Sequence, residues 1–226
     1  MLTMIESEVG DHQHERVTVL AGDLITSIVL AGGKGRRLGK NKLLEVVGQR
    51  LLLQRVVDSL IPISRRILLV TAPGQTIPAI QASETDMAAV ADVYPGKGPL
   101  GGIYTGLSAT DSVHVLVVAA DMPFLNSDLL RHLVRLSTGF DAVMPRVGGE
   151  IEPLHAVYSR ACLPAIQEQI ERSQLQIRVS LEKVRVKYVE EAEIDRFDPG
   201  HLSFFNVNTP DDLEEARSIA AGMESN

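Results

Sequence analysis

The chain has 226 residues, of which 45% are hydrophobic, and a formal net charge of −7. Its length and composition are those of a globular protein with one large domain, and its acidic charge argues against binding along a nucleic-acid backbone. Its one cysteine, Cys162, excludes an internal disulfide, and no apolar run reaches the roughly 18 residues that a membrane helix needs.

The first residues carry acidic side chains where a secretory signal would carry basic ones. Together with the single cysteine, this predicts a protein of the reducing cytoplasm with no membrane partner. Residues 1–24 are predicted to form an N-terminal extension, either flexible or an added edge element. A single domain is expected to span residues 25–226.

Strand-like apolar runs alternate with helical patterns from residue 25 onward. The first strand, Ile25–Ala31, precedes a helix over Leu51–Leu60 whose apolar residues share one face. Asn126 or Ser127 is expected to cap a helix over Asp128–Leu136. The further expected strands are Ile67–Val70, Ala88–Val90, Val113–Ala119, Ala142–Met144, Ala156–Tyr158, Val184–Val189 and Phe204–Asn206, with helices after the glycine pair at 101–102, over Arg160–Arg172 and over Asp211–Ala221.

This alternation predicts an α/β fold with three layers, in which helices cover both faces of a mostly parallel, Rossmann-like sheet. Ligands of such sheets gather at the carboxyl ends of the strands. Gly32–Lys42, Thr71, Asp92 and Asp121 all follow predicted strands. The fold is therefore expected to bring these four regions together in one site.

The segment from Gly32 to Lys42 is strongly basic, although the chain as a whole is acidic. The strand before it ends in Gly32 and Gly33, and five Lys or Arg residues with no acid follow between Lys34 and Lys42. Glycines let the backbone point its N–H groups at an anion, and clustered cations add charge where a phosphate chain would lie. The segment therefore predicts a phosphate-binding loop.

Two common phosphate-binding motifs do not fit this loop. A Walker A loop needs a glycine at position 34 and a hydroxyl at position 41, where this chain has Lys34 and Asn41. The dinucleotide fingerprint fits Gly33 and Gly35 but meets Leu38 at its third glycine. What remains is the pattern L-A-G-G-x-G-x-R-L-G, with a lysine three residues on.

Asp121 is the strongest single candidate among the acidic residues. Five apolar residues lead directly into it and Pro123 turns the chain away, and an unpaired carboxylate would be costly in the core. A carboxylate oxygen suits Mg²⁺, which keeps several waters and shares the phosphates of a nucleotide. The alternative is an aspartate that only forms a turn or caps a helix.

The glycine loop resembles the signature of the GlmU-like and MobA-like nucleotidyltransferases, which transfer a nucleoside monophosphate from a nucleoside triphosphate. Further segments follow in the order of that family: G-P-L-G-G at 98–102, A-A-D-M-P-F at 119–124, P-L-H-A at 153–156 and F-F-N-V-N-T-P-D-D-L at 204–213. Together they resemble the molybdenum cofactor guanylyltransferases over residues 25–221. The resemblance implies a fold like that of nucleotide-diphospho-sugar transferases.

The resemblance also implies roles for individual residues. It places catalysis on Arg37, Lys42 and Asp121, with Asp121 binding Mg²⁺. It places the GTP contacts on Leu30, Ala31, Gly32, Gly33, Lys42, Thr71, Asp92 and Asp121. Thr71 stands where relatives often have Asn, so its hydroxyl could replace a single hydrogen bond to the base. Asp92 has the alternative interpretation of a solvated loop residue.

Asn206 and Asn208 flank Val207, so in a strand both amides would point the same way. The resemblance implies that they bind the pterin-bearing substrate, with Arg178 as a basic neighbour. The alternatives are a cap at the entry to the last helix for the asparagines and a merely exposed arginine at Arg178. His155, a lone histidine before a strand, is expected to be structural.

The resemblance thus predicts an enzyme that transfers GMP from GTP to molybdopterin, with or without bound molybdenum, and releases pyrophosphate. Mg²⁺ is the expected cofactor, and molybdoenzymes or other cofactor-biosynthesis proteins are candidate partners. The alternatives are transfer of CMP in place of GMP, transfer to another phosphorylated acceptor, and a non-catalytic protein that binds a nucleotide and delivers the cofactor.

Overall fold

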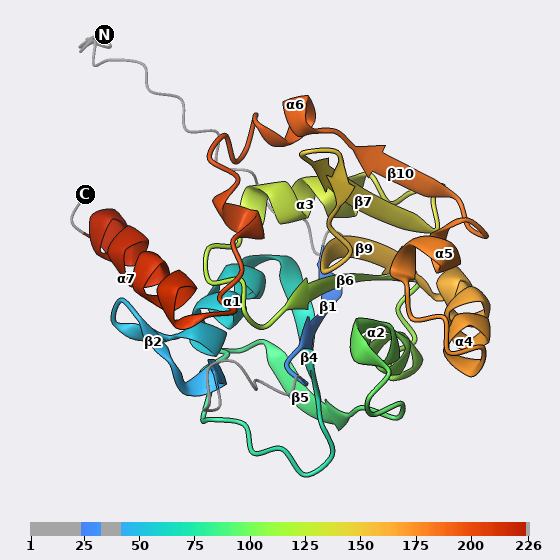
Figure 1. Cartoon of the computed structure of the whole chain (residues 1–226), viewed down its shortest axis with the longest axis horizontal. Helices are drawn as coiled ribbons and strands as arrows, with labels where there is room; N and C mark the ends of the chain where they lie inside the picture. The colour runs from blue at the N-terminus through green and yellow to red at the C-terminus, as the bar shows by residue number, and fades with distance from the viewer. Residues whose placement is uncertain (1–23, 33–41, 225–226) are drawn as a thin grey trace, which may run out of the picture.

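The computed structural model describes residues 24–32 and 42–224 (Figure 1). Most of the strands form one eight-stranded sheet in the order β10-β7-β9-β6-β1-β4-β5, with β8 paired to β7. Its strands are β1 Ile25–Leu30, β4 Ser64–Thr71, β5 Asp86–Ala91, β6 His114–Ala119, β7 Ala142–Val147, β8 Glu150–Ile151, β9 His155–Ser159 and β10 Val186–Val189. β2 (Val46–Val47) and β3 (Arg50–Leu51) form a separate hairpin.

The sheet is mostly parallel, as predicted. β6, β1, β4 and β5 run parallel to one another, and β10 runs parallel to β7. β9 is antiparallel to both of its neighbours, β6 and β7. The carboxyl ends of β1, β4, β5 and β6 therefore lie at one edge of the sheet.

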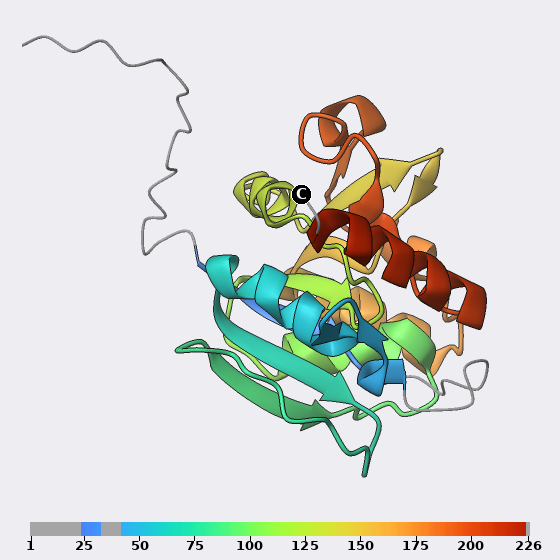
Figure 2. The same cartoon turned by 90° about the vertical axis from the view of Figure 1, so that its left-hand side faces the viewer.

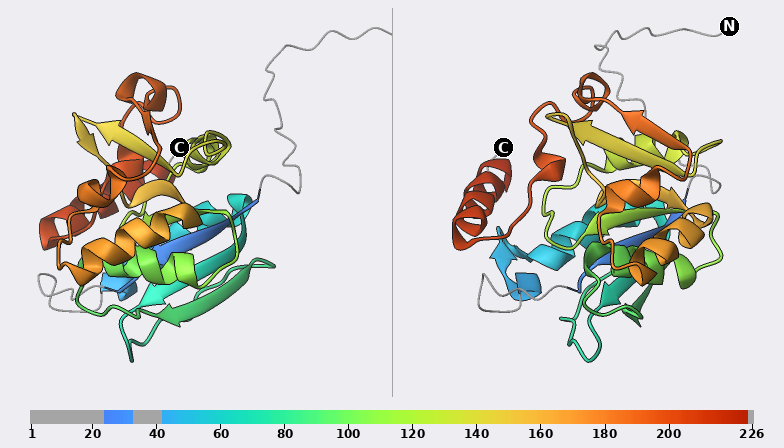
Figure 3. Two further views of the ribbon diagram at one scale, coloured as in Figure 1. Left: turned by 90° about the vertical axis from the view of Figure 1, so that its right-hand side faces the viewer. Right: turned by 45° about the vertical axis from the view of Figure 1, so that its right-hand side comes forward.

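Helices cover both faces of the sheet, which confirms the three-layer α/β fold. α1 (Leu52–Leu60) and α3 (Ser127–Arg135) lie on one face (Figure 2), and α2 (Gly98–Ser108), α4 (Leu163–Glu171) and α5 (Ile177–Leu181) on the other (Figure 3). Successive strand residues point to opposite faces, so Val29 packs beneath α1 and Ile28 beneath α2. The short helix α6 spans Glu191–Ile194.

The last helix, α7 (Pro210–Glu224), packs outside these three layers, beside the β2–β3 hairpin (Figure 1). Its apolar side packs Leu213, Ala216 and Ala220 into a cluster with Val47 of the hairpin. Val207, just before the helix, belongs to the same cluster. This packing holds the chain around Val207 against the domain. Within the described residues, no helix is long and apolar enough to cross a membrane.

The predicted start of the helix at 101–102 was wrong, because α2 begins at Gly98 and contains both glycines. These glycines allow close packing and do not end a helix. A Cβ on Gly101 would lie 2.8 Å from the carbonyl oxygen of Tyr94, and one on Gly102 would lie 3.0 Å from the Leu30 side chain. The absence of side chains at these positions lets α2 approach the end of β1 closely.

Gly106 makes the same kind of contact and gives a stability prediction. A Cβ there would lie 2.6 Å from two carbons of Ile28, which is fully buried. We expect Gly106→Ala to lower the free energy of unfolding by about 1–3 kcal/mol through overpacking. Gly222→Ala is the matched control, because a Cβ in that part of α7 meets nothing within 4 Å and alanine is favoured in helices by up to about 1 kcal/mol. Urea denaturation of both variants tests the prediction, and equal effects of the two substitutions would contradict it.

The strand predicted over Phe204–Asn206 was also wrong. The chain instead makes a 3-10 turn over Leu202–Phe204 and then runs without a strand partner to α7. The Asp198 carboxylate fixes the turn by accepting the backbone N–H groups of Leu202 (3.1 Å) and Ser203 (2.8 Å). The alternation of apolar and polar residues there reflects packing of single side chains rather than a strand.

The cap predicted for α3 is confirmed at Asn126. Its Oδ1 accepts the backbone N–H groups of Asp128 (3.0 Å) and Leu129 (2.9 Å). The other predicted elements differ from the prediction mainly at their ends, as strands commonly do when neighbouring strands extend the hydrogen-bonded ladder. The short elements β2, β3, β8, α5 and α6 were not predicted. β4, for example, begins three residues earlier than expected, at Ser64.

The connections of the sheet reverse direction at β1. From β1 the chain passes through α1 to β4 and β5, and then returns through α2 to β6 on the other side of β1. In open α/β sheets, ligands bind in the crevice formed where the strand order reverses. The carboxyl ends of β1 and β6 are therefore where the fold places a binding site.

Candidate active site

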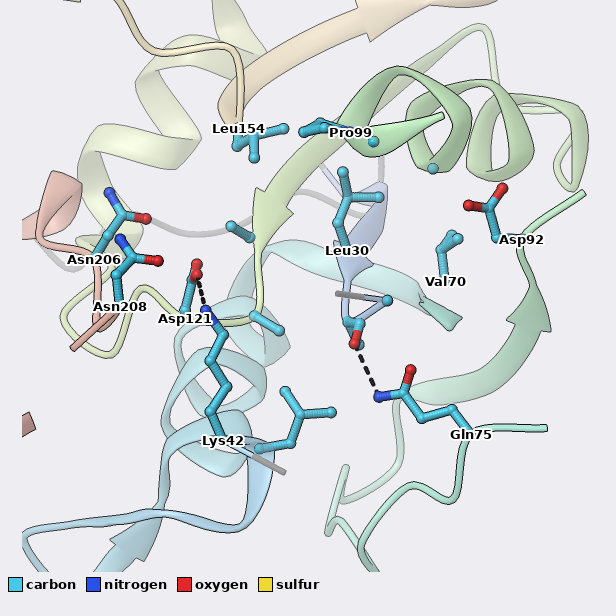
Figure 4. Close-up of a pocket in the computed structure, with 17 residues that line it drawn as sticks. Leu30, Lys42, Val70, Gln75, Asp92, Pro99, Asp121, Leu154, Asn206 and Asn208 are labelled. Atoms are coloured by element: carbon cyan, nitrogen blue, oxygen red, sulfur yellow. Dashed lines mark hydrogen bonds and ion pairs between the residues drawn. The ribbon is translucent and has the colours of Figure 1, made fainter. Parts of the chain in front are cut away.

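A cavity of about 460 Å³ opens at this edge, within the usual size range of small-molecule sites. It is lined by the ends of β1, β4 and β6, the start of α2 and the segment before α7 (Figure 4). Most of the predicted site residues that the structure describes line this cavity. Gly33 and Arg37 lie outside the described residues, and their roles stay predictions.

Lys42 and Asp121 form an ion pair at one end of the cavity (Figure 4). The ammonium group of Lys42 donates to Oδ2 of Asp121 and also to the carbonyl oxygen of Val207, at 3.3 Å. The backbone carbonyl of Asp121 accepts the N–H of Val207 at 2.9 Å. Lys42 therefore links the carboxylate at the end of β6 to the segment that carries the two asparagines.

The second oxygen of Asp121 fits a site for a cation. Oδ1 is buried and has no hydrogen-bond partner among the described residues, although a buried carboxylate oxygen without a partner is costly. Asp121 lines a cavity in which a nucleotide could supply phosphate oxygens and water. Such a mixed set of oxygen ligands, with one or two carboxylates from the protein, is the usual environment of Mg²⁺.

The backbone at the end of β1 is already hydrogen-bonded. The N–H groups of Ala31 and Gly32 both donate to the carbonyl oxygen of Val70, at 2.8 and 2.9 Å, and the carbonyl of Leu30 accepts from Ala120 at 3.2 Å. All three predicted residues, Leu30, Ala31 and Gly32, line the cavity. Their contact with a ligand would therefore come from carbonyl oxygens and van der Waals surface, since the N–H groups of Ala31 and Gly32 are engaged.

Asp92 lines the cavity, whereas Thr71 does not. Oδ1 of Asp92 accepts from the backbone N–H of Tyr94 and the hydroxyl of Thr105, both at 2.9 Å, which fixes the carboxylate at the cavity wall. Thr71 is buried, and its carbonyl accepts the N–H of Asp92 at 2.8 Å. The structure therefore gives the predicted contact of Thr71 with the base no support, and Thr71 acts on the site through Asp92.

Gln75, four residues after Thr71, also lines the cavity. It was not predicted as a site residue from the sequence. Its side chain donates to the carbonyl oxygen of Ala31 at 3.0 Å (Figure 4). The sequence signal was the preceding Pro73-Gly74 pair, which predicts a tight turn after β4. A turn at that point returns the next side chain toward the strand ends.

Asn206 and Asn208 both line the cavity and lie beside Asp121 (Figure 4). The shared orientation was predicted correctly, although the strand on which it was based is absent. The amide of Asn206 donates to the carbonyl of Phe204 at 2.8 Å. The side-chain cap of α7 is Thr209, whose Oγ1 accepts the N–H of Asp212 at 3.1 Å, so the Asn208 side chain is not needed as the helix cap.

Asp212 completes this helix start. Its carboxylate accepts the backbone N–H groups of Asn208 and Thr209, both at 2.8 Å. These two backbone hydrogen bonds hold the pKa of Asp212 below its usual value. The reciprocal bonds of Thr209 and Asp212 form a capping box that fixes where Asn208 stands.

Arg178 lies away from this cavity. It stands on α5, where its exposed guanidinium pairs with Glu150 of β8 at 3.1 Å, and it does not line the cavity. Its predicted contact with the acceptor therefore gains no support from the geometry, which agrees with the alternative of an exposed arginine.

His155 is buried and structural, as expected. Its Nε2 lies 2.6 Å from the hydroxyl of Ser203, which also accepts the backbone N–H of Asn126 at 2.9 Å. The ring packs on Phe204 with centroids 4.5 Å apart. Burial lowers the pKa of His155 to about 4, so the ring is neutral and shares one hydrogen bond with the Ser203 hydroxyl. It thereby anchors the turn that precedes Asn206.

The lowered pKa of His155 predicts acid sensitivity. The folded value of about 4 lies below the usual value of 6.5, so the stabilising contribution of the neutral ring is complete above pH 6.5 and is lost as the pH falls toward 4. Between these values the loss is roughly 1.4 kcal/mol for each pH unit. Urea denaturation as a function of pH should show a shallower slope for His155→Gln, which can still hydrogen-bond the Ser203 hydroxyl but does not titrate. An unchanged slope would contradict the assignment.

Comparisons with known proteins agree with this geometry. The family model of the MobA-like NTP transferase domain matches residues 27–186. The probable molybdenum cofactor guanylyltransferase of Pelotomaculum thermopropionicum is 35% identical, over 86% of this chain and 93% of its own. The crystal structure of molybdopterin-guanine dinucleotide biosynthesis protein A from Archaeoglobus fulgidus is 28% identical with a TM-score of 0.73, and the match covers 88% of this chain and all of that one.

A more distant structure shares the fold alone. The 2-C-methyl-D-erythritol 4-phosphate cytidylyltransferase of Thermus thermophilus is 19% identical with a TM-score of 0.64, over 88% of this chain and 99% of its own. The same arrangement of sheet and helices therefore occurs in a protein named for a different nucleotide and acceptor. Because a fold can serve several functions, the substrates have to be argued from the site.

Proposed function

Because the chain belongs to the MobA-like NTP transferase family, we propose that it is an enzyme that transfers GMP from GTP to molybdopterin and releases pyrophosphate. The observation that carries the proposal is the junction of Lys42, Asp121 and Val207. It places a cation, a carboxylate and the segment of Asn206 and Asn208 around one end of a cavity. Relatives named for this activity match nearly the full length of the chain.

The chemistry needs charge neutralisation and alignment more than proton transfer. A terminal phosphate oxygen of the acceptor is already anionic, so it can attack the α-phosphorus of GTP without a strong general base. Lys42 is suited to the phosphates because its ammonium group can exchange the Asp121 oxygen for a phosphate oxygen. Arg37 is proposed to contribute a second positive charge, which stays a prediction because it lies outside the described residues.

Mg²⁺ is proposed to bind at Asp121, through the buried Oδ1 that lacks a protein partner in the described part of the chain. When bound, the ion would neutralise phosphate charge and help to orient the triphosphate. The protein groups around it supply the rest of the alignment. Asp121 is itself held in place, because its backbone carbonyl is tied to Val207.

The acceptor is proposed to bind on the side of Asn206 and Asn208. Amide groups both donate and accept hydrogen bonds, as do the edges of a pterin ring. Leu154 lines the same part of the cavity and offers apolar surface to a flat ring (Figure 4). The position next to Asp121 brings an acceptor phosphate toward the α-phosphorus, which is the alignment that in-line transfer requires.

The test is an assay with GTP, Mg²⁺ and molybdopterin that follows pyrophosphate release and formation of the guanine dinucleotide. Calorimetry with GTP, CTP and UTP separates the alternatives. A clear preference for CTP would overturn the proposed nucleotide. Binding of GTP without pyrophosphate release in the presence of molybdopterin would favour a non-catalytic carrier. We also propose that the enzyme works in the cytoplasm and passes its product to molybdoenzymes or other cofactor-biosynthesis proteins.

A further inference from the structure

The cavity has two chemically different ends (Figure 4). Lys42, Asp121 and the two asparagines lie at one end, and Gln75 and Asp92 lie beyond Leu30 at the other. If the triphosphate binds at the charged end, the base of the nucleotide must extend toward the second end. From this arrangement we propose that Gln75 is a residue that selects the base, by presenting a fixed N–H donor beside the carbonyl oxygen of Ala31. The inference rests on the proposed function, which places a nucleotide in this cavity.

A tight turn places Gln75 at the cavity. The backbone N–H of Gln75 donates to the carbonyl of Ala72 at 3.0 Å, and Gly74, at the third position of the turn, has a φ of +74°. With Pro73 at the second position, this is a type II turn, in which glycine is favoured because side chains disfavour that φ. The turn follows β4 directly, so the Cα atom of Gln75 is held close to the end of the sheet.

Both polar atoms of the Gln75 carboxamide are hydrogen-bonded. Its Nε2 donates to the carbonyl oxygen of Ala31 at 3.0 Å, and its Oε1 accepts the backbone N–H of Ala72 at 3.0 Å. A glutamine amide that is free to rotate by half a turn can present either its donor or its acceptor. Here a flip would face Oε1 with the carbonyl of Ala31 and Nε2 with the N–H of Ala72, so one orientation is strongly preferred.

This arrangement supplies a donor where the backbone supplies none. The N–H groups of Ala31 and Gly32 are both engaged by the carbonyl of Val70. The amide nitrogen of Gln75 has two hydrogens, of which one binds Ala31, so the second remains for a ligand. The carbonyl oxygen of Ala31 also retains a second lone pair. A donor and an acceptor therefore stand 3.0 Å apart at the cavity wall.

A donor beside an acceptor is complementary to a base edge on which a carbonyl oxygen adjoins a ring N–H. Guanine has this order at O6 and N1, and uracil has it at O4 and N3, whereas adenine and cytosine have an amino group beside an unprotonated ring nitrogen. Because the ribose fixes the orientation of the base in the cavity, an amide held in one orientation distinguishes a carbonyl oxygen beside an N–H from an amino group beside an unprotonated nitrogen. An amide that rotates freely could pair with either edge. For a guanine nucleotide, O6 would accept from Gln75 and N1–H would donate to Ala31.

Base analogues test this assignment atom by atom. Inosine triphosphate keeps O6 and N1–H, whereas 2-aminopurine riboside triphosphate lacks both. By calorimetry, the wild-type protein should bind the first nearly as well as GTP and the second clearly more weakly. Gln75→Met should weaken binding of GTP by about tenfold, the usual effect of losing one hydrogen bond. The same substitution should cause little further loss with 2-aminopurine riboside triphosphate.

Two further variants separate base selection from support of the turn. Gln75→Glu keeps an acceptor for the N–H of Ala72 and so keeps the support of the turn, but it cannot donate. Its second carboxylate oxygen would face the carbonyl oxygen of Ala31, so it should lose GTP affinity together with the stability that the bond to Ala31 contributes. Gln167→Met is the matched control, because Gln167 is a half-buried glutamine of α4 that donates to Glu171 and does not line the cavity. It should leave all affinities unchanged.

The outcomes are distinct. If the wild type binds GTP but Gln75→Met weakens GTP, inosine triphosphate and 2-aminopurine riboside triphosphate equally, or weakens none, base selection by Gln75 is wrong and the proposed function stands. If the wild type binds no guanine nucleotide, both are wrong. A loss that depends on O6 and N1–H, and that Gln75→Glu reproduces, supports the inference.

Discussion

Replacing Asp121 by asparagine is expected to lower kcat/KM for Mg²⁺-dependent pyrophosphate release by at least about 10²- to 10³-fold, the range seen when one preorganised electrostatic contact is removed. The side chain keeps its shape, but the charge that pairs with Lys42 is lost. The buried Oδ1, which lacks a partner within residues 24–32 and 42–224, would no longer carry the charge that attracts a divalent cation. Magnesium should therefore no longer strengthen GTP binding.

Two measurements check this expectation. Steady-state assays give the loss of turnover, and calorimetry with and without Mg²⁺ gives the loss of metal dependence. Asp111→Asn is the matched control, because the Asp111 side chain is fully exposed near the opposite end of β6. Turnover close to that of the wild type in Asp121→Asn would overturn the assignment of the metal and of the catalytic carboxylate.

Lys42→Met is the second substitution with a large expected effect. We expect kcat/KM to fall by about 10²- to 10³-fold, because the charge that faces the phosphates is lost. A second effect follows from the hydrogen bond of Lys42 to the carbonyl oxygen of Val207, at 3.3 Å. Without it, the segment of Asn206 and Asn208 keeps only the hydrogen bond from Val207 to Asp121 at this end of the cavity, among the residues that the structure describes. The KM for molybdopterin should therefore rise as well.

Separate KM values for GTP and molybdopterin test this dual role. A rise for GTP alone would show that the contact with Val207 does not order the acceptor segment. Lys183→Met is the matched control, because Lys183 pairs with Glu168 on the exposed surface. Lys42→Met combined with Asp121→Asn should cost less than the sum of the two single effects, since residues in direct contact are coupled.

Local sequence patterns were enough to predict the layers of the fold. The run Val113–Ala119 is apolar at almost every position, which is typical of a strand buried on both faces, and β6 lies there. Asn126 was predicted as a cap because a polar side chain before an amphipathic run can accept the free N–H groups of a helix start, and it does so. These predictions needed neighbouring residues alone.

Position after a strand also predicted where the acidic residues gather. Asp92 and Asp121 follow strands that proved to be parallel, so both line one cavity. The same reasoning placed Thr71 in the site, but that side chain is buried beside the cavity. Position after a strand indicates the edge of the sheet and does not decide the direction of a side chain within the turn that follows.

The amino-acid sequence by itself thus determined the alternation of strands and helices and the carboxylate at the end of β6, because each depends on residues close together in the chain. The tertiary structure alone decided which groups are free to act. It engaged the N–H groups of Ala31 and Gly32 with Val70, locked Gln75 against Ala31, and joined Lys42 to Val207. These contacts join residues 38 to 165 positions apart, so they form only when the order of the strands and the packing of α7 bring distant segments together.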